Sequence, residues 1–440
     1  MLEAQAIDLS RAPIFVLGMH RSGTSCLAAL LQAAGAVLPG PVIRNWDNPH
    51  GHHEALSLLR LNEDVLATSG GHWLRAPETL RWTPEQAALR DQLLSLRPAG
   101  GPALWKDPRS LLTWPFWQAG PLPLRAIGVI RHPLAVARSL LAWRSMPLEE
   151  GLRLWRAHVE VLATLELPIL DFDAPADEFV YAVTDIARQM GLQAEPDILR
   201  AAYRSEERHH HRGPGPSASP ELLAACETLY GQLGGRPSSS STPFPWDAIE
   251  AARAALARGD RGEAREQARL ALAEAPEAAL PALCMAFLRR HAGAALLDVL
   301  PTSSPSVELV RGKCLLDAGR AAEAVPVLRA AAELYEARHL LPVALWESGE
   351  AEAADRELEK LLSESLYPFR VHARRAEWAW LRGQVDRARQ HLDAALEAAP
   401  PWRKGRLLHR RAEWREQQGE TDAAAQDRAQ AAVIDPGYRR

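Results

Sequence analysis

The sequence is poor in cysteine and contains no long apolar run. Its 440 residues include only four cysteines, and these are scattered without a C-x-x-C pair. This spacing argues against a disulfide framework and against a zinc site, so we expect no metal. No eighteen consecutive apolar residues occur, and residues 1–12 lack the apolar core of a signal peptide. We therefore expect no membrane span and a cytoplasmic location.

The sequence also lacks a large excess of either charge. Its 51 basic and 55 acidic residues give a formal net charge of −4. A balance this small argues against broad nucleic-acid or membrane-surface binding. Any anion-binding site must therefore be local. The apolar fraction of 47% is typical of globular proteins, and the length predicts two or three domains.

Composition divides the chain into three segments. Residues 1–230 mix short apolar runs, Gly/Pro breaks and helical patterns. Residues 231–245 read GQLGGRPSSSSTPFP, which predicts a linker with too little apolar surface to fold. Residues 246–440 are rich in Ala, Leu, Glu and Arg with helical periodicity. We therefore predict two folded domains, 1–230 and 246–440, joined by this linker.

The first segment alternates short apolar strands with helical stretches. We predict four strands, at residues 13–17, 103–105, 125–130 and 168–172. Strands that are apolar throughout and separated by helices are typical of a parallel sheet covered on both faces. The predicted fold of this segment is therefore α/β, with a parallel sheet sandwiched by helices.

The last segment contains an internal repeat with the pattern G-x4-A-x6-[AL]. Successive glycines are 60, 30, 34 and 36 residues apart, and the gap of 60 predicts a degenerate unit near Gly293. Glycine permits a tight turn, alanine lets helices approach closely, and proline ends a helix. The matching positions are Gly259, Gly319, Gly349, Gly383 and Gly419; Ala264, Ala324, Ala354, Ala388 and Ala424; Ala271, Ala331, Leu361, Ala395 and Ala431; and Pro276, Pro400 and Pro436.

This pattern resembles the tetratricopeptide repeat (TPR), a helix-turn-helix unit of about 34 residues. The resemblance implies an all-α solenoid whose concave face binds a protein partner or an extended acceptor. The alternative is a helical bundle without repeats. The glycine and the two following positions of the pattern recur at fixed spacing, which favours the repeat over the bundle.

The segment Gly18-Met-His-Arg-Ser-Gly-Thr-Ser25 lies between a predicted strand and a predicted helix. Backbone N–H groups converge in such a turn, and the helix N-terminus adds positive potential, so we expect an anion-binding loop. The glycine spacing is that of a nucleotide P-loop, which makes this domain P-loop-like. However, Thr24 stands where a P-loop has lysine. This difference argues against ATP or GTP hydrolysis, and a Gly/Ser turn without a ligand is the other alternative.

The same residues resemble the 5′-phosphosulfate loop of sulfotransferases that use 3′-phosphoadenosine-5′-phosphosulfate (PAPS). Arg21, Ser22, Gly23, Thr24 and Ser25 match that loop, [KR]-S-G-T-[ST], at every position. The resemblance implies that Arg21 contacts the leaving phosphate and the sulfuryl oxygens. A planar, bidentate cation there stabilises charge that develops in the transition state.

A second match concerns the 3′-phosphate. In this family an arginine at a strand end and a serine eight residues later bind that group, and Arg131 and Ser139 have this spacing. Pro133 suits the start of the intervening helix. Alone the pair would carry little weight; after the first loop it supports the same family.

Two further segments resemble those of bacterial and tyrosylprotein sulfotransferases. Glu54 falls where such enzymes carry an acidic general base, and His52 and His53 are alternatives because small-molecule sulfotransferases use histidine. Lys106, in Trp-Lys-Asp-Pro-Arg, matches a lysine that stabilises the sulfuryl group. Asp107 and Arg109 are interpreted either as part of that site or as a structural pair.

Other polar and aromatic residues are less specific. The basic cluster Arg204–Arg212 is interpreted either as a lid over the nucleotide or as a solvated tail. Cys26, in the first helix, is expected to be a small core residue. The aromatic side chain that stacks on adenine is not identified; the candidates are Trp46, Trp73, Trp82, Trp114 and Trp117.

Taken together, the motifs predict a metal-independent sulfotransferase with PAPS as donor. The catalytic residues would be Glu54, Arg21 and Lys106. The acceptor would be a hydroxyl or amine on a sugar, peptide or small molecule, with the TPR-like segment binding a partner or that acceptor. The alternative is a TPR scaffold whose α/β domain binds nucleotide but is inactive.

Overall fold

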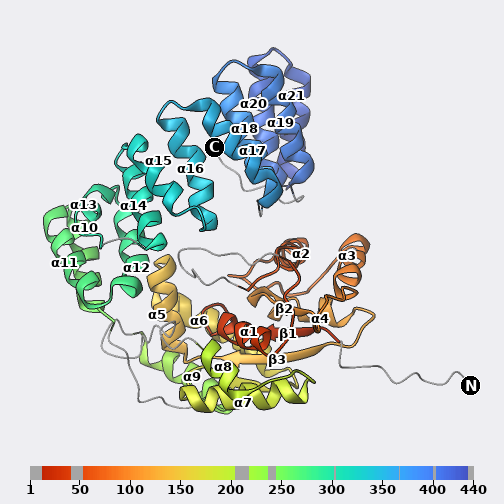
Figure 1. Ribbon diagram of the computed structural model, residues 1–440. Coiled ribbons are helices and arrows are strands. Elements are labelled where there is room, and N and C mark those ends of the chain that lie inside the picture. The colour runs from red at the N-terminus through yellow and green to blue at the C-terminus, as the bar shows by residue number, and fades with distance from the viewer. Residues whose placement is uncertain are drawn as a thin grey trace, which may run out of the picture. The chain divides into compact units, whose positions relative to one another are not determined.

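The computed structural model is mostly helical and contains one small parallel sheet (Figure 1). Its backbone divides into two compact units, Met1–Gly319 and Arg320–Arg440. Within the described residues, no helix combines the length and apolar character needed to cross a membrane. The structure describes residues 12–40, 53–203, 218–235, 244–301, 304–365, 367–399 and 403–434.

The sheet of the first unit has the strand order β2-β1-β3-β4, and every pair of neighbours is parallel. All four predicted strands are present within a residue or two of the expected positions. They are β1 (Ile14–Leu17), β2 (Leu104–Lys106), β3 (Arg125–Ile130) and β4 (Ile169–Asp171). The prediction of an α/β domain with a parallel sheet is therefore confirmed.

Helices cover both faces of the sheet because successive strand residues point to opposite sides. Ile14 and Val16 pack with helices α1, α7 and α8, whereas Phe15 and Leu17 pack with α2, α4, α5, α6 and α9. The helices are α1 (Thr24–Ala33), α2 (Leu56–Thr68), α3 (Pro84–Leu94), α4 (Trp114–Gln118), α5 (Pro133–Arg144), α6 (Leu148–Ala163), α7 (Ala176–Gln189), α8 (Pro196–Ala202) and α9 (Pro220–Gln232).

The strand order creates a topological switch point between β1 and β3. From β1 the chain crosses to β2 on one side, and from β3 it crosses to β4 on the other. The loops after β1 and β3 therefore diverge around the carboxyl edge of the sheet. In open α/β sheets, ligands bind in the crevice at such a point.

The first unit extends beyond residue 246, where we predicted a separate domain to begin. The helices that follow residue 245 form a hydrophobic core with Ala142 of α5. The buried ring of Trp246 is part of that core. Most of the predicted linker, residues 236–243, lies outside the described residues. The predicted domain boundaries therefore stay a prediction, but the first helices after the linker pack with the α/β part. These helices are α10 (Trp246–Arg258), α11 (Arg261–Glu274), α12 (Pro276–Leu288), α13 (Gly293–Leu297) and α14 (Pro305–Asp317).

The second unit consists of helices joined by short turns. Gly349, Gly383 and Gly419 adopt φ of 89°, 71° and 81°, so each supplies the left-handed turn between two helices. The alanines of the repeat pattern that lie in this unit are fully buried between paired helices. The helices of this unit are α15 (Ala321–Ala330), α16 (Tyr335–Glu347), α17 (Ala351–Glu364), α18 (Pro368–Leu381), α19 (Val385–Ala398), α20 (Lys404–Gln417) and α21 (Thr421–Ile434). The assignment of these helices to TPR units stays a prediction, and Pro400 and Pro436 lie outside the described residues.

Candidate functional site

The loop after β1 has a backbone conformation that depends on its glycines. Gly23 precedes α1 with φ of 92°, and a Cβ there would lie 2.3 Å from Cγ of Phe172. A Cβ at Gly18 would lie 2.6 Å from the carbonyl oxygen of Val129. Arg21 also has a left-handed backbone, with φ of 68°, which is uncommon for a residue other than glycine. The loop is thus held close to the ends of β3 and β4.

The side chains predicted to bind opposite ends of a nucleotide lie close together. Arg21 donates from Nε to Ser139 Oγ at 2.9 Å. Arg131 donates from Nη1 to the carbonyl oxygen of Arg21 at 3.3 Å. Ser139 is presented by α5, which begins at Pro133 directly after the β3 loop. The structure therefore brings Arg21, Arg131 and Ser139 into direct contact beside the ends of β1 and β3.

A second cluster lies at the end of β2. Lys106 Nζ donates to Glu54 Oε1 at 2.8 Å and to Ser25 Oγ at 3.1 Å. Lys106 is 2% and Glu54 8% exposed, so both charges are buried. A buried ion pair persists only with good geometry and further hydrogen bonds. Lys106, Glu54 and Ser25, at the start of α1, are thereby fixed relative to one another.

A buried polar network supports this second cluster, and sequence reasoning missed its centre, Asn62. The Asn62 amide donates from Nδ2 to Asp107 at 2.8 Å and to Ser110 at 2.9 Å. Its Oδ1 accepts from Thr113 at 2.6 Å and from Trp117 at 2.8 Å. All four hydrogen-bonding positions of the amide are thus used. The network fixes the Asp107 carboxylate directly after Lys106.

Asp107 also pairs with Arg109, as one interpretation of the sequence expected. Arg109 Nη1 lies 2.8 Å from Asp107 Oδ1, and Arg109 Nη2 lies 3.5 Å from Glu63. Asp107 is fully buried and Arg109 is largely buried. The Arg109–Asp107 pair is therefore part of the framework beside Lys106.

An aromatic and cationic cluster borders the loop on its outer side. The ring of His20 lies 4.5 Å from that of Trp73. Arg144 lies 5.1 Å from the centre of the Trp73 ring and 4.2 Å from that of Trp143. Burial, with the nearby charges of Arg109 and other cations, holds the pKa of His20 well below its usual value, so this imidazole is neutral. Sequence reasoning named Trp73 as one of several candidates for adenine stacking, but missed His20, Trp143 and Arg144, because only contacts in the folded chain bring these residues together.

The alternative residues named from the sequence are distributed as follows. His53 Nδ1 donates to Gln32 Oε1 at 2.6 Å. Trp114 and Trp117 are buried in the core, and Trp82 packs edge-on against Phe116. Of the candidates for adenine stacking, Trp73 alone among the described ones lies beside the loop. His52, Trp46 and Arg204–Arg212 lie outside the described residues.

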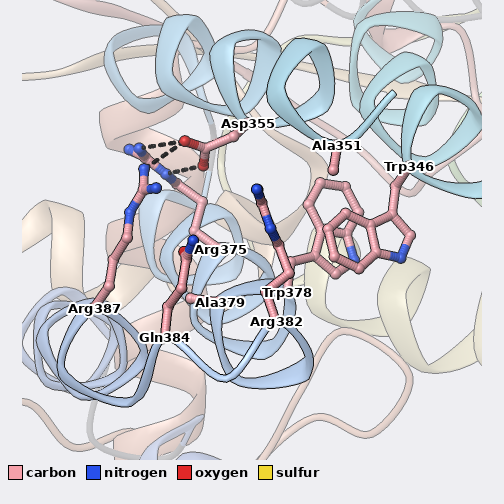
Figure 2. Close-up of a pocket in the computed structure, with 9 residues that line it drawn as sticks. All are labelled: Trp346, Ala351, Asp355, Arg375, Trp378, Ala379, Arg382, Gln384 and Arg387. Atoms are coloured by element: carbon pink, nitrogen blue, oxygen red, sulfur yellow. Dashed lines mark hydrogen bonds and ion pairs between the residues drawn. The ribbon is translucent and has the colours of Figure 1, made fainter. Parts of the chain in front are cut away.

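A small pocket in the second unit is the other candidate site (Figure 2). At one end Asp355 accepts hydrogen bonds from Arg375 at 2.9 Å and Arg387 at 2.5 Å. At the other end Trp346 and Trp378 stack in parallel with centroids 4.6 Å apart. The guanidiniums of this pocket are thus already paired with carboxylates. It is lined by Trp346, Ala351, Asp355, Arg375, Trp378, Ala379, Arg382, Gln384 and Arg387.

The described residues contain no group of three or more histidine, cysteine, aspartate or glutamate side chains placed to hold a metal ion. Comparison with known proteins adds no further assignment. No protein-family model matches the sequence, and no curated protein matches it significantly.

Proposed function

We propose that this protein is a sulfotransferase that transfers a sulfuryl group from PAPS to a hydroxyl or amine acceptor. The observation that carries the proposal is the contact of Arg21 with both Arg131 and Ser139. The Lys106–Glu54 pair is joined to the same loop through Ser25. An isolated arginine would carry little weight. Two groups of donors at the carboxyl edge of adjacent strands match a ligand with an anionic group at each end.

In this proposal Arg131 and Ser139 bind the 3′-phosphate. Ser22, Gly23, Thr24 and Ser25 bind the 5′-phosphosulfate through backbone and hydroxyl donors at the start of α1. Arg21 lies between the two groups, since its Nε bonds Ser139 and its backbone belongs to the loop. Its Nη donors are then directed to the leaving phosphate. No metal ion is required, because these cations neutralise the donor.

The reaction is an in-line attack on sulfur. The acceptor oxygen forms a bond to sulfur while the bond from sulfur to the bridging phosphate oxygen breaks. The acceptor proton passes to Glu54, and 3′-phosphoadenosine-5′-phosphate (PAP) leaves with the electron pair. Lys106 and Arg21 stabilise negative charge on the sulfuryl and bridging oxygens. Since Lys106 bonds both Glu54 and Ser25, it aligns the base with the donor loop.

The acceptor in this proposal is a sugar, a peptide or a small molecule, and the TPR-like helices bind a protein partner or an extended acceptor. The protein would act in the cytoplasm. The second candidate is a scaffold in which the helical repeats act and the α/β domain binds nucleotide without turnover. The charged residues at this site favour the enzyme, because a scaffold has no need of the buried Lys106–Glu54 pair.

The test is calorimetric titration of the full chain with PAP, followed by incubation with radiolabelled PAPS and a cell extract. The enzyme binds PAP and transfers label to one fraction, with or without EDTA. Binding without transfer supports the scaffold, and an absence of PAP binding refutes the nucleotide site. Label transfer that EDTA abolishes contradicts the metal-independent mechanism.

Two variants separate the roles of the arginines. Arg21→Ala should lower turnover by at least about 100-fold with an unchanged fold, the scale observed when one transition-state donor is removed. Arg131→Ala should chiefly weaken PAP binding. Near-normal turnover in the first variant would remove Arg21 from the mechanism, and unchanged PAP affinity in the second would exclude Arg131 as the 3′-phosphate ligand.

A further inference from the structure

A buried carboxylate, that of Asp173, lies beside Arg131 and belongs to no motif recognised in the sequence. Asp173 follows β4 and is 6% exposed. Its Oδ2 accepts a hydrogen bond from the backbone N–H of His132 at 2.7 Å. Its Oδ1 lies 3.7 Å from Nε of Arg131. One carboxylate therefore contacts both residues at the end of β3.

Asp173 contacts Arg131 directly, and it is connected to Ser139 through the start of α5 at His132. His132 is the N-cap residue of α5 and has no side-chain cap of its own. A carboxylate at a helix N-terminus is stabilising, and here it fixes the start of the helix that carries Ser139. Arg131 is 4% exposed, and a guanidinium buried to this extent requires a nearby countercharge. Asp173 supplies that charge and an orientation for the Arg131 side chain.

Helix α9 contacts the same region mainly through Asp171, whose Oδ1 also accepts a hydrogen bond from the backbone N–H of Asp173 at 3.0 Å. Tyr230 is 3% exposed, and its hydroxyl lies 2.5 Å from Asp171 Oδ1 and 3.4 Å from Asp173 Oδ2. One turn earlier, Glu227 pairs with Nε2 of His132 at 3.2 Å. Helix α9 is thus tied to the segment between β3 and α5 through Glu227, and to the end of β4 through Tyr230.

We propose that Asp173 is a positioning residue that fixes Arg131 and the start of α5, and so gives the site its selectivity for a 3′-phosphorylated nucleotide. Tyr230 supports Asp173 through Asp171, whose Oδ1 accepts from both the Tyr230 hydroxyl and the Asp173 backbone N–H. The proposal rests on the proposed function, since it assumes that Arg131 and Ser139 bind the 3′-phosphate. It adds two residues, one of them on α9, to those that determine recognition of this group.

The test compares the affinities of the full chain for PAP and for adenosine 5′-monophosphate, which lacks the 3′-phosphate. Asp173→Ala should lower the preference for PAP by about tenfold, the scale of a lost hydrogen bond to a charged group. Tyr230→Phe, which retains the ring, should lower it by about threefold. Asp185→Ala, which removes an exposed carboxylate on α7, is the matched control and should leave the preference unchanged.

The outcomes distinguish this proposal from its premise. If the unaltered chain does not bind PAP, the proposed function fails and the role of Asp173 fails with it. If that chain prefers PAP but both variants keep its preference, Asp173 and Tyr230 do not position the site. Equal weakening for both nucleotides indicates a structural role and also overturns the proposal. An increased preference for PAP means that Asp173 acts only by repelling phosphate, which again overturns it.

Discussion

Substitution of Gly23 by alanine should destabilise the first unit and distort the anion-binding loop. The added methyl group would lie 2.3–2.8 Å from three ring carbons of Phe172, a residue that is 4% exposed. The φ of 92° at this position is also strained for any residue with a Cβ. Two separate penalties, in the backbone and in packing, therefore act on this one variant.

The structure provides a control that separates the two penalties. Gly35 has nearly the same backbone, with φ of 98°, but nothing lies within 4 Å of the Cβ that alanine would add. Gly35→Ala should therefore lower the free energy of unfolding by about 1–2 kcal/mol, the backbone term alone. Gly23→Ala should lower it by about 2–5 kcal/mol, because overpacking adds roughly 1–3 kcal/mol.

The assay is urea denaturation of the full chain, read by tryptophan fluorescence, with PAP titration as the functional measurement. A double variant sharpens it: with Phe172→Ala present, the methyl group at residue 23 meets no ring, so Gly23→Ala should have only the effect of the Gly35 control. Equal losses in the two single variants, or no relief in the double variant, would show that Phe172 does not confine the loop.

Three other measurements test separate parts of the structure. A chain ending at residue 319 should stay folded, whereas one ending at residue 245 should aggregate, because the helices after residue 245 pack against the end of α5. Solubility and thermal melting test this, and a soluble, cooperatively melting chain that ends at residue 245 would contradict it. Burial lowers the pKa of His158 to about 4, so its contribution to stability is present above pH 6.5 and is lost as the pH falls toward 4. The loss is about 3 kcal/mol, and His158→Leu should flatten the dependence of unfolding free energy on pH in that range. The rings of Trp380 and Trp414 stack in parallel with centroids 4.6 Å apart. Trp380→Leu should therefore lower the unfolding free energy of the second unit by about 1–3 kcal/mol. An unchanged denaturation midpoint would show that the stack does not stabilise this unit.

Local sequence features predicted the elements of the first unit well. The apolar run Ala126–Ile130 is bounded by Arg125 and Arg131, and Pro133 is suited to the first turn of a helix. Strand β3 and helix α5 occupy those positions. Strand order was not predictable, because all four runs are short and mainly apolar, and the choice among their pairings depends on how the helices pack. Helix α12 packs against α5, and this contact places the first repeat helices in the first unit.

The candidate site was predicted where its residues are close in sequence and missed where they are not. Arg21 and Ser25 lie in one short motif, and Arg131 and Ser139 are linked by helix geometry. Asn62 and Asp173 belong to no motif: an asparagine in a helix and an aspartate after a strand are ordinary surface residues until the fold buries them. Their roles arise from contacts with residues at least 41 positions away in the sequence, which spacing within a short motif does not encode.

The hydrogen bond between Arg21 and Ser139 joins residues 118 positions apart. A site that contains such a long-range contact cannot exist in a partly assembled chain, because both strands and the intervening crossover must already be in place. Ligand binding at this site would therefore be linked to global unfolding of this unit rather than to local fraying. A nucleotide at one hundred times its dissociation constant would raise the unfolding free energy by about 2.7 kcal/mol.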